Sequence, residues 1–147
     1  MYQYAEQLLD LIEKSPSSYH ATANLKNRLT AEGYTALAED AAWDVRPGGR
    51  YIVTRNDSSL LAFRVPEGGV TGFALAAAHS DSPTFQIKEH AEKLSARCTV
   101  LDTEKYGGML MNTWFDRPLS VAGRIIVERD GKLEARLVDV DRDLMII

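Results

Sequence analysis

Cysteine, clusters of basic residues and long apolar runs are scarce or absent in this sequence of 147 residues. The single cysteine, Cys98, cannot form a disulfide within the chain, which is typical of a protein from a reducing compartment. No apolar run approaches the roughly 18 residues that a membrane span requires. The first residues carry Glu6 and Asp10, unlike the basic segment that precedes the apolar core of a signal peptide. We therefore expect a cytoplasmic protein.

Positive charge is also limited. The chain has 17 lysines and arginines against 21 aspartates and glutamates, which gives a formal net charge of -4. No cluster of basic residues is available to neutralise the phosphates of a nucleic acid or an anionic membrane surface. The hydrophobic fraction of 45% and the charged fraction of 26% are those of an ordinary globular protein. We expect neither nucleic acid nor membrane among its partners.

The most informative segment is the uncharged apolar run 73–78, which ends in His79-Ser80-Asp81. A short run of this kind predicts a buried strand of a parallel sheet, and ligands bind where such strands end. Side chains alternate along an extended backbone, so His79 and Asp81 share one face. One can serve as a metal ligand and the other as the carboxylate that orients it. Taken alone, the pair is equally compatible with a structural polar contact.

The first 35 residues have the pattern of two helices. Apolar residues recur at helical spacing in the first of them: Ala5, Leu8, Leu9 and Ile12. Pro16 separates the two helices, and either Ser17 or Ser18 can cap the second. Gly33 is placed to end that second helix.

The remaining chain is rich in strand signals. Segments 51–54 and 60–65 predict a hairpin, and segments 119–127 and 132–140 predict another around Asp130-Gly131. Alternation of apolar and polar residues also predicts a strand over 94–100, with Cys98 as a buried, inert thiol. By itself, this second half indicates part of an antiparallel sheet or sandwich.

Nine segments resemble the aspartyl aminopeptidases, a family of two-zinc exopeptidases, in the same order and at compatible spacing. The clearest is Gly-Phe-Ala-Leu-Ala-Ala-Ala-His-Ser-Asp-Ser-Pro at 72–83, where Ser80 replaces the threonine that is usual in the family. The other matching segments are 15–21, 24–29, 47–51, 54–60, 106–108, 113–117, 119–124 and 133–142. The resemblance therefore covers nearly the whole chain.

The resemblance implies an α/β fold. Residues 1–93 would form the N-terminal part of a three-layer zinc-peptidase domain, and residues 94–147 the start of an inserted β-rich domain used for dimer contacts. His79 would be a ligand of one of two zinc ions, and Asp81 the carboxylate that supports the site. The substrates would be peptides, with acidic N-terminal residues preferred, and the protein would be a homo-oligomer through its β-rich part.

The chain lacks the rest of such a site. A zinc ion needs three or four protein ligands, and the chain has only three histidines: His20, His79 and His90. The family's other ligands and its catalytic glutamate fall beyond Ile147, so we expect a fragment of about a third of the enzyme, inactive alone. Two alternatives stay open: a truncated paralogue that acts as an assembly module, and a small hydrolase of unrelated mechanism. The second needs a nucleophile with a paired base, which the sequence does not offer.

Overall fold

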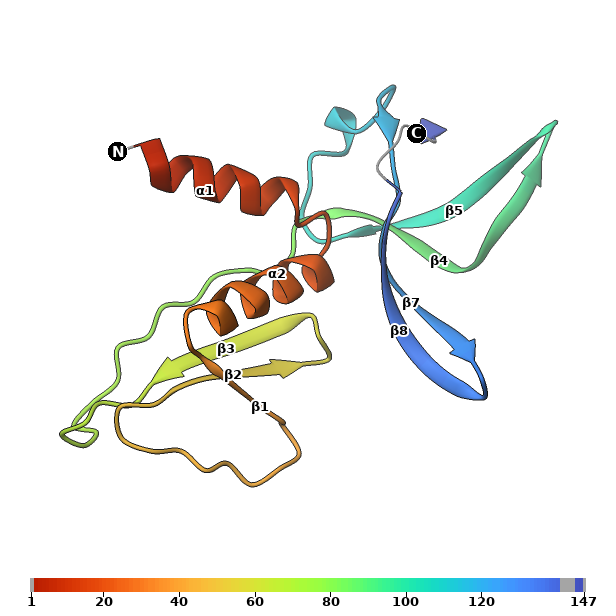
Figure 1. Ribbon diagram of the computed structural model, residues 1–147. Helices are drawn as coiled ribbons and strands as arrows, with labels where there is room; N and C mark the ends of the chain where they lie inside the picture. The colour runs from red at the N-terminus through yellow and green to blue at the C-terminus, as the bar shows by residue number, and fades with distance from the viewer. Residues whose placement is uncertain (1, 141–144, 147) are drawn as a thin grey trace. The chain divides into compact units, whose positions relative to one another are not determined.

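The computed structural model describes residues 2–140 and 145–146 and shows a mixed α/β architecture (Figure 1). The chain divides into two compact units. The first unit contains Met1–Asp81 and Ser120–Asp141, and the second contains Ser82–Leu119 and Arg142–Ile147. The domain boundary expected between residues 93 and 94, and the three-layer arrangement, stay predictions.

Two helices open the first unit, as the sequence predicts: α1 (Tyr2–Glu13) and α2 (Ser18–Ala31). Ser17 is the N-cap of α2, and its hydroxyl accepts a hydrogen bond from the backbone N–H of His20 at 3.4 Å. Gly33 follows the end of α2 with φ of +84°, a left-handed conformation that glycine adopts without steric cost. The predicted start and stop of α2 are both confirmed.

The core of the first unit lies in a three-stranded sheet. Strand β1 (Thr35–Leu37) runs parallel to β2 (Arg50–Arg55), which pairs antiparallel with β3 (Ser59–Arg64). Helix α2 packs on this hairpin (Figure 1). The buried apolar residues of this sheet are Tyr51, Ile52 and Val53 of β2, and Ile52 is the largest described side chain that is fully buried. The hairpin predicted around residues 56–58 is confirmed.

A second hairpin of the first unit is formed by β7 (Ala122–Arg129) and β8 (Lys132–Asp139). Its turn residues, Asp130 and Gly131, have φ of +53° and +72°. Positive φ at both positions is the requirement of a tight two-residue hairpin turn, which explains why this dipeptide predicts the hairpin correctly.

The second unit is built on a long hairpin of β4 (Thr84–Ser95) and β5 (Cys98–Tyr106). It also holds the short helix η1 (Met111–Thr113) and a pairing of β6 (Pro118–Leu119) with β9 (Met145–Ile146). The register of β4 against β5 shifts between Ile87 and Glu92, where a bulge interrupts the ladder.

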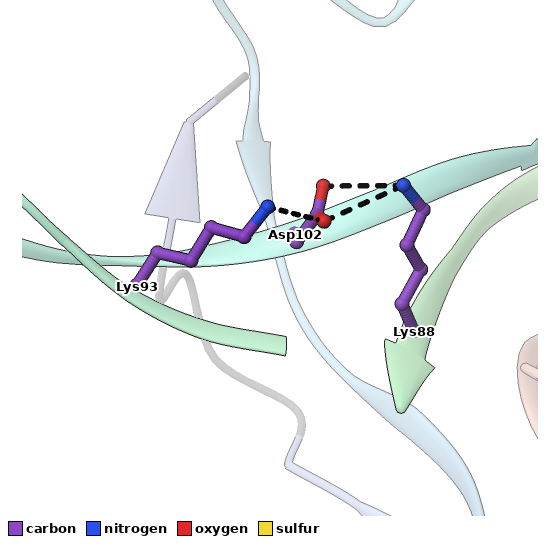
Figure 2. A network of polar contacts seen from close by, with 3 residues as sticks. All are labelled: Lys88, Lys93 and Asp102. Atoms are coloured by element: carbon purple, nitrogen blue, oxygen red, sulfur yellow. Dashed lines mark hydrogen bonds and ion pairs between the residues drawn. The ribbon is translucent and has the colours of Figure 1, made fainter. Parts of the chain in front are cut away.

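Three charged side chains, those of Lys88, Lys93 and Asp102, link β4 and β5 at this bulge (Figure 2). The carboxylate of Asp102 accepts a hydrogen bond from Lys93 Nζ at 2.6 Å and lies 3.4 Å from Lys88 Nζ. The hydrogen bond from Lys93, followed by that from Lys88, lowers the pKa of Asp102 below its ordinary value of 3.8.

This contact predicts an acid-sensitive hairpin. A carboxyl group whose pKa is lower in the folded chain contributes stability above its unfolded pKa, and that stability is lost as the pH falls through the folded value. We expect the dispersed amide signals of β4 and β5 to weaken as the pH falls below 3.8, measured by NMR. The variant Asp102→Asn should lose most of this pH dependence. Equal acid responses of the two proteins would contradict the prediction.

Two features of the predicted strand 94–100 are wrong. The chain reverses at Ala96, which has φ of +55°, so the segment is the tip of the β4–β5 hairpin and not one strand. The sequence pattern does not reveal this turn, because apolar and polar residues keep alternating through it and no glycine, asparagine or aspartate marks it. Cys98, predicted to be buried, is exposed because it lies at this tip, where no other described element covers it.

The predicted buried strand at 73–78 is also contradicted. The segment is extended without strand pairing, and it is drawn in green without an arrow (Figure 1). Phe73 is 87% exposed and Leu75 is 89% exposed. A strand interior to a parallel sheet needs a neighbour on each side for its N–H and C=O groups. Among the described residues no strand pairs with this segment, so its apolar side chains stay in solvent.

Candidate functional site

The structure brings the two predicted site residues together. His79 Nδ1 lies 2.9 Å from Asp81 Oδ1, directly after the exposed run 73–78. The His79 side chain is 91% exposed, whereas that of Asp81 is 33% exposed. The contact is the one expected for residues two apart on an extended backbone.

This contact determines which ring nitrogen of His79 can bind a metal. An ionised carboxylate only accepts hydrogen bonds, so a neutral imidazole in this geometry carries its hydrogen on Nδ1. The lone pair is then on Nε2, and no described residue is bonded to that atom. Metal-binding histidines commonly have this arrangement, because the carboxylate fixes the tautomer and the orientation of the ring.

Ser80 ties this segment to the rest of the first unit. Its hydroxyl donates a hydrogen bond of 2.8 Å to the backbone carbonyl of Ser58, in the turn between β2 and β3. From the sequence, Ser80 is expected to be an ordinary turn hydroxyl. The real partner is 22 residues away, and no local pattern signals a contact of that kind.

The other two histidines do not join His79. His20 Nδ1 lies 2.8 Å from Ser17 Oγ at the start of α2, a local contact at the N-terminal end of that helix. His90 projects from the bulge of β4, 3.9 Å from Glu89. Within the described part of the chain, no three His, Cys, Asp or Glu side chains come together in a way that could hold a metal ion. His79 and Asp81 thus fit one zinc ligand and its orienting partner.

In the described ranges, 2–140 and 145–146, no helix is long and apolar enough to cross a membrane.

Comparison with known families settles the relationship. A family model described as "Aminopeptidase I zinc metalloprotease (M18)" matches residues 11–147. The chain belongs to the M18 aminopeptidase family. The predicted resemblance is therefore confirmed, and M18 is a family of zinc metalloproteases.

Individual relatives match almost the whole chain. A probable M18 family aminopeptidase 2 of Clostridium acetobutylicum is 42% identical over 150 aligned residues, covering 99% of this chain and 35% of the relative. The probable M18 family aminopeptidase 2 of Pseudomonas aeruginosa is 46% identical, covering 95% of this chain and 33% of the relative. The chain thus spans about a third of the length of the curated relatives that it matches.

Solved structures confirm the mixed α/β fold. One match is a protein chain in a cryo-EM structure of the Ape4 and Nbr1 complex, with a TM-score of 0.92 and 40% sequence identity. The match covers 95% of this chain and 28% of that chain. It also matches the Saccharomyces cerevisiae mApe1 dodecamer, with a TM-score of 0.82, 25% identity and coverage of 95% and 34%. At least one solved structure of this fold is therefore a dodecamer.

Proposed function

We propose that this chain supplies one third of a zinc aminopeptidase that removes acidic residues from the N-termini of peptides. The observation that carries the proposal is the contact between His79 and Asp81, in a chain that belongs to a family of zinc metalloproteases. The preference for Asp or Glu follows from the resemblance to the aspartyl aminopeptidases. We also propose that it acts in the cytoplasm, a reducing compartment compatible with the single cysteine, Cys98.

In this proposal His79 holds one of two zinc ions through Nε2. Asp81 keeps the imidazole hydrogen on Nδ1 and holds the ring in one orientation through its 2.9 Å contact. When bound, zinc lowers the pKa of a coordinated water and polarises the substrate carbonyl.

The remaining ligands and the general base belong, in this proposal, to segments outside the described residues. One histidine with its carboxylate is fewer than the three or four protein ligands of a zinc site. We therefore propose that the isolated chain is inactive. We further propose that residues 1–93 join a three-layer catalytic domain, and that residues 94–147 join a β-rich domain that mediates homo-oligomerisation.

A chimera provides the test. Residues 1–147 would replace the matched third of the Clostridium acetobutylicum relative, to which the chain is 42% identical. The chimera should bind zinc and cleave peptides that begin with Asp or Glu faster than peptides that begin with Leu. A chimera that folds and binds zinc but cleaves neither peptide would contradict the proposed function. Faster cleavage of the Leu peptide would contradict only the acidic preference.

Substitution of Asp81 should weaken zinc binding without abolishing it. The variant Asp81→Ala should lower the zinc affinity of the chimera by about 10- to 100-fold, the usual effect of removing a partner of a metal-bound histidine. Asp81→Asn should lose less, because its amide oxygen still accepts from Nδ1. Zinc affinity is measured by competition with a chelator. Asp40→Ala, an exposed carboxylate of the same unit, is the matched control and should leave the affinity unchanged.

A further inference from the structure

A chain of contacts connects the His79 segment to three distant parts of the first unit. It begins at the hydrogen bond from Ser80 Oγ to the carbonyl of Ser58, 2.8 Å long and part-buried. Ser58 belongs to the three-residue turn 56–58 between β2 and β3. The residue between the proposed metal ligand and its carboxylate is therefore bonded to the turn of the hairpin that holds the core.

The turn itself has a demanding backbone conformation. Asn56 and Asp57 have φ of +50° and +54°, in the left-handed region that most residues avoid. Asparagine and aspartate tolerate this region better than other non-glycine residues. The N–H of Ser58 donates to the carbonyl of Arg55 at 3.2 Å, which closes the turn. The carbonyl of Ser58 is thus presented to Ser80 by a turn of defined shape.

An arginine from β7 holds this turn from a third segment. Arg124 donates to the backbone carbonyl of Asn56 at 2.9 Å and to the side-chain Oδ1 of Asn56 at 3.1 Å. Its guanidinium carbon also lies 4.3 Å from the centroid of the Tyr19 ring, at the start of α2. A planar guanidinium donates these two hydrogen bonds from separate nitrogens while its face lies near the ring, whereas a lysine has a single nitrogen for all of these contacts.

We infer that Ser80 is a positioning residue for His79, and that Arg124 supports it through the turn 56–58. The inference rests on the proposed function of His79. The segment around His79 is not part of a strand, so no ladder of backbone hydrogen bonds fixes its position. Fixing Ser80 on the turn restricts the backbone on both sides of it. That restriction keeps the imidazole and the Asp81 carboxylate within hydrogen-bond distance.

The test reads the tautomer of His79 in the 147-residue chain. Long-range ¹H–¹⁵N NMR spectra recorded at alkaline pH show which of the two ring nitrogens carries the hydrogen. An imidazole in water favours the hydrogen on Nε2, whereas the contact with Asp81 favours it on Nδ1. Ser80→Ala should shift the ring toward the Nε2–H form. Ser80→Thr keeps the hydroxyl and should preserve the Nδ1–H form.

Matched controls separate positioning from a general loss of structure. Ser59→Ala removes a neighbouring hydroxyl that bonds only within the hairpin, at 3.4 Å to Arg55, and should leave the tautomer unchanged. Arg124→Ala should move the tautomer in the same direction as Ser80→Ala, and Arg124→Lys should not restore it. An unchanged tautomer in Ser80→Ala, or the same shift in Ser80→Thr, would overturn the inference. Because the measurement needs no zinc, either result is independent of whether the chimera is an aminopeptidase.

Discussion

Replacing His79 with alanine should abolish the zinc-dependent peptidase activity of the chimera. In the proposed site, His79 supplies one of only a few zinc ligands, and alanine has no side-chain atom that can coordinate a metal. His79→Ala should lower zinc binding by more than the roughly 10- to 100-fold expected for Asp81→Ala, because Asp81→Ala leaves the proposed ligand in place. Activity on an acidic N-terminal peptide and zinc content by elemental analysis are the two measurements.

His90→Ala is the matched control for this prediction. It removes another exposed histidine, which projects from the bulge of β4 and shares no cluster of metal-binding side chains with other described residues. This variant should keep both activity and zinc. If His79→Ala kept full zinc content and full activity, the role proposed for His79 would be wrong, whatever the fate of Ser80.

The local elements of this fold could be predicted because their signals are local. Ser17 and Gly33 mark the two ends of α2 by capping chemistry, and both marks are found where the sequence places them. Asp130-Gly131 marks a hairpin because both residues tolerate positive φ. In each case one or two residues decide the conformation of their own backbone.

The errors occur where a conformation depends on partners far along the chain. Segment 73–78 has the composition of a buried strand, but burial requires neighbouring strands, and the described residues provide none for it. Cys98 is predicted to be buried from alternation alone, which does not show whether another layer covers that face. Alternation gives the period of a strand and not its surroundings.

In the candidate site, too, the local contact could be predicted from the sequence and the long-range contacts could not. The contact between His79 and Asp81 could be predicted from a spacing of two residues. The contact of Ser80 with Ser58, and that of Arg124 with Asn56, could not. They join segments that only the folded chain brings together, and the residue types involved are common at turns.

The exposed run 73–78 predicts that the isolated chain associates with itself. Phe73 and Leu75 are 87% and 89% exposed within an uncharged segment whose backbone is unpaired. Such a segment can form strand hydrogen bonds with the same segment of a second copy and bury its apolar side chains there. Burial of one leucine contributes about 1.5–3 kcal/mol, which corresponds to roughly 10- to 100-fold in a dissociation constant.

A single charge placed in this run should therefore disperse the assembly. Leu75→Lys is expected to raise the dissociation constant of self-association by about 10-fold or more, measured by sedimentation velocity. Leu94→Lys makes the same chemical change at a residue that is 90% exposed, but its backbone already pairs with Thr99 in the β4–β5 hairpin, so it should have little effect. Dispersal by Leu94→Lys alone would locate the interface in the β-rich part instead. A wild-type chain that sediments as a 16.3 kDa monomer at all concentrations would contradict self-association itself. Comparing Leu75→Lys with Leu94→Lys shows whether self-association needs an unpaired backbone or only an exposed apolar side chain. The two leucines differ mainly in whether their backbone already has a strand partner.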